Sequence, residues 1–550
     1  MRMIERIWRW SERPIETLGG AAFIIALAGV ASRVLGFIRD RLLASSFGAG
    51  DVLDAYYAAF RLPDLIYGFL VLGALSAAFI PVFTELIAHD EKERAWRLVQ
   101  GALQWLVMIL GGSAIIGIIF AETIAIWIAP GFSPEKQALV AHLTRIILIS
   151  PIFLAISAVI GGVLVSFKQF LAYSFAPVFY NLGIIFGITV LYPTWGPTGL
   201  AIGVVLGSFL HVAVQFPAFR RSGYRITFLS FATSRKDQAL RKVARLMIPR
   251  SLAVAVNQLS LIIVTVFSST LVSGSLAAFT LAINIQSVPL GLFGIAFSLA
   301  SFPVLSTLAA KRENEEFFSV FARTARRILY FVVPFSLLFI IFRAEIVRIV
   351  LGTGAFNWED TILTFTVLGW LSVSLFAQSL IPLFVRTFFA LQDTKTPLFA
   401  ALFSELVHLS LIPLLLPRFA VAGIAVAFSV GAITNIAILY FFLRRRVPVW
   451  RDWDILSGVG RIVGIALIAA VVAQYSKGIF ALTIDRLDTF LEVAVKLGVG
   501  TVIGVATYIA FSALLALPEY LQVKRFIWCR LLRRPETMAL TEDHPEKGDW

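Results

Sequence analysis

The 550-residue chain has little cysteine, histidine or charge. Cys529 is its only cysteine, which excludes an internal disulfide and a metal site built from several cysteines. The five histidines are scattered, and the sequence contains no HExxH motif, no P-loop and no paired-carboxylate motif for prenyl diphosphates. Only 15% of the residues are charged. These absences argue against the corresponding enzyme classes and against a soluble globular protein.

What the chain has instead is apolar sequence in long runs. Hydrophobic residues make up 59% of it, and runs of about 18 residues or more recur, which is typical of membrane-spanning helices. The sequence therefore predicts an all-α integral membrane protein. The fourteen expected transmembrane helices cover residues 20–45, 54–87, 97–128, 137–166, 170–193, 198–219, 244–270, 276–309, 318–342, 360–390, 396–416, 422–443, 458–476 and 491–516.

The distribution of lysine and arginine along the chain predicts its orientation in the membrane. With a cytoplasmic N-terminus, about 34 of the 47 Lys and Arg residues lie in cytoplasmic segments and about four in outer loops, as the positive-inside rule requires. The formal net charge of +14 is thereby explained, and we expect no nucleic-acid partner. Residues 1–19 are expected to form a basic amphipathic helix on the membrane surface, and 517–550 a cytoplasmic tail. Both termini are predicted to be cytoplasmic.

An internal repeat appears at an offset of about 222 residues. FIPVFTEL at 79–86 matches SFPVLSTL at 301–308, and six helices are duplicated as six more. An even number of helices per copy makes the repeats parallel, and such transporters bind substrate between two halves that rock for alternating access. The expected domains are an N-lobe at 20–219, a basic cytoplasmic linker at 220–243, a C-lobe at 244–443 and two further helices within 444–516.

Charged residues fall at membrane depth in the first helix. The segment SRVLGFIRD (32–40) follows an apolar run and carries Arg33, Arg39 and Asp40. An arginine at the bilayer centre costs about 2.5–3.5 kcal/mol on insertion scales, so such charges normally face a protein interior or a watery cavity. This segment is therefore a candidate part of a transport path.

The second helix adds charges on one of its faces. Asp54, Arg61 and Asp64 are separated by seven and three residues, which places them on the same side of a helix. Two such helices predict a net-cationic cavity for an anionic substrate, although the same charges could instead form an intramembrane ion-pair network. The candidate substrate-binding residues are Arg33, Arg39, Arg61 and Arg145, and those expected to orient them are Asp40, Asp54 and Asp64.

The C-lobe carries polar residues at membrane depth. A lone carboxylate such as Glu405 is costly there unless it is protonated, paired or bound to a metal. The oxygens of Asn257, Glu405 and Asn435 could hold a sodium ion, and Glu405 with His408 could relay protons. The alternative is a neutral glutamic acid that braces the lobe through hydrogen bonds. No metal site is assigned with certainty.

Several segments resemble one family of transporters. ASRVLGFIRD (31–40), SFGAGDVLDAYYAAFRLPDL (46–65) and GALSAAFIPVFTEL (73–86) are similar to the N-terminal signature of the MurJ/MviN family of lipid II flippases, and FAPVFYN (175–181) and LQDTKTP (391–397) resemble its later loops. This family belongs to the multidrug/oligosaccharidyl-lipid/polysaccharide exporter superfamily. The resemblance covers essentially all of residues 20–516. It implies fourteen transmembrane helices and a transporter that moves a lipid-linked peptidoglycan precursor from the inner to the outer leaflet.

The resemblance also implies roles for particular residues. Family members carry essential charges in the first helix, which match Arg33, Arg39 and Asp40, and Asp54 fits a family acidic position. Lipid II carries a diphosphate, whose oxygens the planar arginine fork can bind in a bidentate manner. The resemblance supports a groove for the prenyl tail at the last two helices, which the sequence alone would equally read as lipid-facing or dimer-forming.

The chain departs from the family pattern in two places. Family members often carry an arginine pair where this chain has Tyr67 and Gly68. They also often carry an arginine in the eighth helix, where this chain has Asn284, which becomes a weak candidate for substrate contact. The C-lobe is therefore expected to be less cationic than in other members.

These observations predict a flippase for lipid II, the undecaprenyl-diphosphate-linked disaccharide-pentapeptide, in the bacterial cytoplasmic membrane. It is expected to work by alternating access without a cofactor, driven by the membrane potential or by a monovalent cation, Na⁺ or H⁺. Membrane lipids and the cell-wall synthesis machinery are the other expected partners. The alternatives are a flippase for another polyprenyl-linked glycan, a cation-coupled drug antiporter of the same superfamily and, remotely, a membrane glycosyltransferase.

Overall fold

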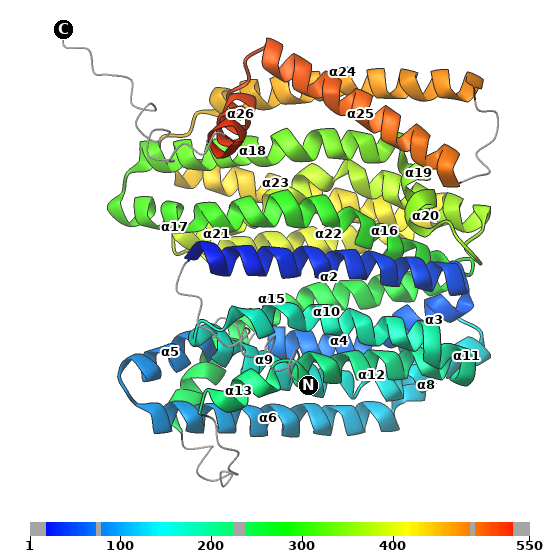
Figure 1. Ribbon diagram of the computed structural model, residues 1–550, viewed down its shortest axis with the longest axis vertical. Helices are drawn as coiled ribbons and strands as arrows, with labels where there is room; N and C mark the ends of the chain where they lie inside the picture. The colour runs from blue at the N-terminus through cyan, green and yellow to red at the C-terminus, as the bar shows by residue number, and fades with distance from the viewer. Residues whose placement is uncertain (1–17, 73–78, 224–236, 484–489, 532–550) are drawn as a thin grey trace. The chain divides into compact units, whose positions relative to one another are not determined.

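The computed structural model describes residues 18–72, 79–223, 237–483 and 490–531, and every regular element in these ranges is a helix (Figure 1). The predicted surface helix at the N-terminus and most of the predicted tail lie outside them. Ten of the described helices are long and apolar enough to cross a membrane, or eleven if a bent pair counts as one span. The chain is thus an all-α membrane protein, and the count of fourteen spans stays a prediction.

The first half of the chain contains short helices as well as long ones. The predicted helix at 54–87 is divided because the path turns between Ala59 and Arg61 and then widens into a π-helix, with residues 73–78 outside the described part. The elements are α2 (Leu18–Phe47), α3 (Asp51–Ala59), α4 (Arg61–Tyr67), η1 (Gly68–Leu72), α5 (Ile80–Ala88), α6 (Lys92–Ile119), α7 (Ala121–Ile128), α8 (Pro134–Ile147), α9 (Ser150–Ser166), α10 (Phe170–Phe186), η3 (Gly187–Leu191), α11 (Tyr192–Trp195), α12 (Pro197–Ala213) and α13 (Phe216–Arg221).

The second half has the same kinds of element. The predicted helix at 360–390 is a pair bent by 48°. The elements are α15 (Gln238–Ser269), α16 (Ser275–Pro289), η4 (Leu290–Ile295), α17 (Ala296–Lys311), α18 (Asn314–Ile341), α19 (Arg343–Leu351), α20 (Trp358–Val373), α21 (Leu375–Ala390), α22 (Lys395–Phe419), α23 (Val421–Arg446), α24 (Asp452–Thr483), α25 (Phe490–Leu514) and α26 (Pro518–Leu531).

The predicted repeat is visible in the helix boundaries. Helices α6 and α18 begin at 92 and 314 and end at 119 and 341, an offset of 222 at both ends. The π-helices η1 and η4 begin at 68 and 290, the same distance apart. Single π-turns inside helices often occur at functional sites, because they leave the regular hydrogen-bond ladder locally broken. Both copies of the repeat therefore carry a π-helix at the same place.

The chain forms two compact units. Unit 1 comprises the described residues of Met1–Ala282, Val350–Val367 and Glu405–Ala427, and unit 2 those of Ile283–Ile349, Leu368–Ser404 and Phe428–Trp550. In unit 1 a core of large apolar side chains, including Phe79, Phe83 and Leu98, joins α5, α6 and α9. The lobe boundaries expected from the repeat stay a prediction.

Unit 2 holds the two helices that lie outside the repeat. Its main core joins α17, α18, α21 and α23, and includes Phe321 and Phe384. A second cluster packs α24 and α25 against α18 through Tyr330, Ile462 and Tyr508. The Tyr508 hydroxyl donates a hydrogen bond of 2.8 Å to the backbone oxygen of Tyr330. Helices α24 and α25 are thus fixed to one helix of the second repeat (Figure 1).

Candidate functional site

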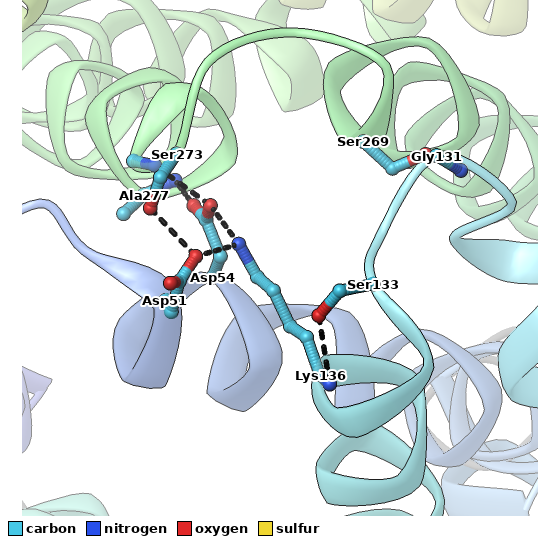
Figure 2. Close-up of polar contacts among 9 residues, drawn as sticks. Asp51, Asp54, Gly131, Ser133, Lys136, Ser269, Ser273 and Ala277 are labelled. Carbon is cyan, nitrogen blue, oxygen red and sulfur yellow. Dashed lines mark hydrogen bonds and ion pairs between the residues drawn. The ribbon is translucent and has the colours of Figure 1, made fainter.

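Asp54 is buried among hydrogen-bond donors at the turn between α15 and α16 (Figure 2). Its side chain is on α3, and the residue is 1% exposed. The carboxylate accepts hydrogen bonds of 2.8 Å from the backbone N–H groups of Gly274 and Ala277. Gly274 directly precedes α16 and Ala277 lies in its first turn, where the helix dipole and unpaired N–H groups favour a negative charge. Asp54 therefore ties α3 to the start of α16.

Lys136 completes this cluster from α8 (Figure 2). Its ammonium group lies 2.8 Å from Asp54 Oδ2 and 2.7 Å from Asp51 Oδ1, and the residue is only 8% exposed. The Phe132 ring covers the ammonium group, with its centroid at 3.9 Å. The Ser273 hydroxyl donates a 2.6 Å hydrogen bond to Asp51. We call Asp51, Asp54, Lys136, Ser273, Gly274 and Ala277 the outer cluster, since the predicted topology puts them at the outer face.

The outer cluster also fixes the charge of Asp51. The hydrogen bonds from Lys136 and then Ser273, together with the positive charge of Lys136, hold the pKa of the Asp51 carboxyl below its ordinary value. Because the Asp51 side chain is 67% exposed, solvent weakens this interaction considerably. Asp51 therefore acts mainly by orienting the Lys136 ammonium group toward the buried Asp54.

Backbone segments touch one another around the outer cluster. Gly274 has φ +87°, and a Cβ atom there would lie 1.7 Å from the Ala49 oxygen. A Cβ at Gly354 would lie 2.3 Å from the Ser45 oxygen, which also accepts a 2.7 Å hydrogen bond from the N–H of Ala355. Only glycine permits such approaches. The turns after α2, α15 and α19 therefore meet without side chains between them.

Arg39, predicted to bind substrate, is held by two side chains. It donates hydrogen bonds of 3.0 and 2.8 Å from Nε and NH2 to Asp40 Oδ1, and one of 3.1 Å from NH1 to Asn181 Oδ1. The Asn181 amide in turn donates to the backbone oxygens of Ser32 and Pro177. Asn181 is the last residue of the FAPVFYN segment, and it links α10 to the charged end of α2.

Arg61 contacts a different helix. Its Nε donates a 2.7 Å hydrogen bond to the Thr265 hydroxyl on α15, and both residues are buried. Asp64, one turn further along α4, is close enough to Arg61 for electrostatic attraction. Arg61 and Asp54 thus join the α3–α4 segment to α15 and to the start of α16.

The other predicted cations lie apart from these groups. Arg33 is exposed on α2 and forms no polar contact with another described residue. Arg145 pairs with Glu122 at 2.9 Å and donates to the backbone oxygen of Ile118, with its side chain 38% exposed. Asp54 bonds Lys136 and two backbone N–H groups, and it pairs with no predicted arginine in this structure.

The predicted C-lobe residues are only partly brought together. His408 Nδ1 lies 2.9 Å from Glu405 Oε1, and His408 is 2% exposed. Asn257 is exposed, whereas Asn284 and Asn435 are half-buried. Within the described ranges no group of three or more His, Cys, Asp or Glu residues is arranged to hold a metal ion. The roles proposed for these residues in ion coupling stay predictions.

A family model described as lipid II flippase MurJ matches residues 43–516. The chain belongs to this family. It is 28% identical over 476 residues to the probable lipid II flippase MurJ of Buchnera aphidicola subsp. Acyrthosiphon pisum, covering 84% of this chain and 92% of the relative. It is 29% identical to that of Rhizobium meliloti, covering 82% and 84%.

Solved structures share the fold. A lipid II flippase MurJ in an inward closed conformation superimposes with a TM-score of 0.74 at 24% identity, covering 93% of this chain and all of that one. An inward-facing multidrug resistance MATE family transporter of the MOP superfamily gives a TM-score of 0.65 at 16% identity, covering 76% and 94%. At these identities the likeness concerns the fold.

Three residues of this MurJ family member were missed from sequence. Lys136 is one of the four Lys and Arg residues that the predicted topology places in outer loops, where such side chains are expected to be solvated. Thr265 carries no charge and gave no signal. Asn181 lies in FAPVFYN, a segment that carried the family resemblance, so its position could have been marked although its partner could not.

Proposed function

We propose that this chain moves lipid II from the inner to the outer leaflet of the bacterial cytoplasmic membrane. The observation that carries this proposal is the match of the lipid II flippase model over residues 43–516. Relatives with the same name match over most of their own length, 92% in the Buchnera protein and 84% in the Rhizobium protein. A transporter, and no enzyme, is the class that this family implies.

Arg39 and Arg61 are the groups that we propose to meet the diphosphate. Both are at membrane depth, and guanidinium stays charged and can bind two phosphate oxygens at once. The residues that hold them, Asp40, Asn181 and Thr265, leave each side chain in a defined orientation. Such orientation lowers the entropy lost when substrate binds. Arg33, which is exposed, is proposed as a third contact.

The outer cluster supports a proposal for how access alternates. Substrate from the inner leaflet requires that the path be closed toward the outside, and Asp54 with Lys136 joins α3, α8 and the start of α16 there. Release to the outer leaflet then requires that Asp54 leave the N–H groups of Gly274 and Ala277. A hydrogen bond to a charged group contributes about 1.5–3 kcal/mol, so the closed state is stable but can be opened.

The membrane potential is the proposed source of energy. A diphosphate carries about two negative charges, and one charge that crosses 100 mV gains about 2.3 kcal/mol. Outward movement of this anion is favoured by a potential that is negative inside. The free energy gained is reduced to the extent that the arginines neutralise the diphosphate charge. Coupling to Na⁺ or H⁺ through the Glu405 and His408 pair is the alternative, and collapse of the potential at constant ion gradients separates the two.

Rescue of a bacterium depleted of its own lipid II flippase tests the proposal. We expect the wild-type chain to restore growth and to prevent accumulation of lipid II in the inner leaflet. The matched negative control is Arg39→Ala, produced at the same level in the membrane. A chain that reaches the membrane, fails to rescue, and instead supports export of another polyprenyl-linked glycan would overturn the assignment of lipid II.

A further inference from the structure

Unit 2 contains a polar cavity at the end of α18 and α24 that is predicted to face the cytoplasm. Its volume is about 710 Å³. The residues that line it come from the first three turns of α18, from the start of α24 and from the residues that begin α26. Four arginines and four carboxylates are among them, namely Arg323, Arg326, Arg451, Arg461, Glu315, Glu316, Asp454 and Glu519.

Two of the four arginines are committed to partners. Arg326 donates a 2.9 Å hydrogen bond from Nε to Glu519, and a second from NH1 to the backbone oxygen of Asp454. Gly458 leaves room for the Arg326 stem, since a Cβ there would lie 2.5 Å from Arg326 Cδ. Arg451 pairs with Glu315 at 3.1 Å. The Arg326 contacts join α18, α24 and α26, whereas the Arg451–Glu315 pair is exposed and contributes less.

The remaining charges are not paired with one another. Arg323, Arg461, Glu316 and Asp454 are exposed, and none of their side chains forms an ion pair with another described residue. On α18, Arg323 follows Glu316 by seven residues. On α24, Arg461 follows Asp454 by the same number. Seven residues of helix span about 10 Å, so both carboxylates lie nearer the cytoplasmic end and both guanidinium groups lie deeper.

A second, apolar cavity continues along the same two helices. It measures about 350 Å³ and begins one turn after the polar cavity, at Tyr330 on α18 and at Ala466 on α24. Helices α25 and α26 complete its walls, with Tyr520 and Lys524 among the residues from α26. From the cytoplasmic surface into the membrane, the carboxylates therefore come first, the guanidinium groups second and the apolar cavity last.

We propose that these cavities form a binding site for an inner-leaflet glycerophospholipid with a primary ammonium headgroup, such as phosphatidylethanolamine. In this lipid the ammonium group is outermost, the phosphate follows, and the acyl chains lie deepest. The ammonium group meets Glu316 and Asp454, the phosphate meets Arg323 and Arg461, and one chain fills the apolar cavity. Arginine suits the phosphate because its fork binds two oxygens.

The carboxylates select against other lipids. A headgroup with negative charge alone, such as phosphatidylglycerol or a prenyl diphosphate, would meet the Arg323 and Arg461 guanidinium groups but would be repelled by Glu316 and Asp454. A choline headgroup keeps its charge but cannot donate hydrogen bonds. The bound lipid would hold α26 against α18 and α24. This proposal assigns the apolar cavity to a phospholipid chain, in place of the prenyl tail that the family resemblance puts at α24 and α25.

Native mass spectrometry of the purified, delipidated full-length protein tests this site, with phosphatidylethanolamine, phosphatidylglycerol and phosphatidylcholine added separately. We expect the tightest binding for phosphatidylethanolamine. Replacing both guanidinium groups, in Arg323→Gln with Arg461→Gln, should weaken it about tenfold or more, because two charge-assisted contacts are lost. Arg97→Gln is the matched control, since Arg97 is an exposed arginine near the cytoplasmic end of α6, the repeat-related helix.

A second pair of variants separates headgroup selection from folding. Glu316→Gln with Asp454→Asn keeps both guanidinium groups, and we expect it to bind phosphatidylglycerol and a polyprenyl phosphate better than the wild type does while its preference for phosphatidylethanolamine disappears. Unchanged preference in this variant would overturn the proposal. So would equal binding of all three phospholipids by the wild type, or a loss in Arg97→Gln as large as in the double arginine variant.

Discussion

Lys136 offers the sharpest test of the outer cluster. Its ammonium group is the only cation among the described residues that contacts Asp54, and both residues are almost fully buried. Lys136→Met would leave the Asp54 carboxylate buried with two backbone donors and no counter-charge. Removing one partner of a buried ion pair costs about 3–5 kcal/mol. If opening the cluster exposes Asp54 to water, the open state should gain about two to three and a half orders of magnitude in population.

Thiol labelling measures this opening. Ser268 on α15 is 1% exposed, and cysteine is close to it in size. In a Cys529→Ser background, Ser268→Cys should react slowly with an impermeant reagent added from outside, and Lys136→Met should speed the reaction about a hundredfold or more. Lys92→Met is the control, since Lys92 and Asp90 form an exposed pair that contributes about 0–1 kcal/mol. The predicted gain there is less than about fivefold.

A double variant shows whether the charge itself is responsible. Asp54→Asn with Lys136→Met removes both charges, so it should label more slowly than Lys136→Met alone, although two weaker hydrogen bonds remain. Labelling that is unchanged in Lys136→Met at equal membrane levels would refute the reasoning. The cluster would then not hold the outer side closed.

Three further outcomes are expected. Because the pKa of Asp51 is lowered in the folded state, its contribution is complete above its unfolded value of about 3.9 and is lost only as pH falls below that; labelling of the Ser268→Cys probe, divided by that of a fully exposed cysteine at the same pH to remove the titration of the thiol itself, should therefore stay constant from pH 8 to about 5. Arg39→Ala should abolish rescue of a flippase-depleted cell and Arg39→Lys should rescue in part, whereas Asn284→Ala should grow nearly normally; the reverse ranking at equal expression would dismiss Arg39 as a substrate contact. Glu345 is 3% exposed and lies 2.7 Å from Lys477 near the end of α24. Glu345→Ala should therefore destabilise the purified protein by about 3 kcal/mol in thermal unfolding, and an unchanged Tm would show that the Glu345–Lys477 pair does not stabilise the fold.

The fold class could be predicted because it depends on local sequence. Long apolar runs specify membrane helices whatever the tertiary structure, and the repeat is visible in the eight-residue segment at 79–86, which shares three identical residues with 301–308. The breaks within those helices were harder to predict. The predicted helix at 54–87 is interrupted near Phe60, where Pro63 cannot donate a hydrogen bond to the Ala59 carbonyl, and again at η1, a π-helix that contains no proline.

The site could be predicted only as a set of charges. Charged residues in apolar sequence are costly, so their presence alone marked Arg39, Arg61 and Asp54. Their partners depend on contacts between distant segments. Lys136 is 82 residues from Asp54, and Thr265 is 204 residues from Arg61, and neither pairing follows from helix periodicity. Conversely, Arg33 was marked on the same grounds, yet the structure leaves it exposed on α2.

The two interpretations of the first-helix charges, ion-pair network and substrate site, are compatible in the geometry of Arg39. A guanidinium group has five donor hydrogens. Nε and NH2 each direct one to Asp40, and NH1 directs one to Asn181, which leaves two that engage no other described residue. Asp40 and Asn181 can therefore hold the plane of the fork while the remaining hydrogens meet phosphate oxygens. Substrate need not displace the ion pair, and the same contacts that stabilise a buried arginine prepare it for an anion.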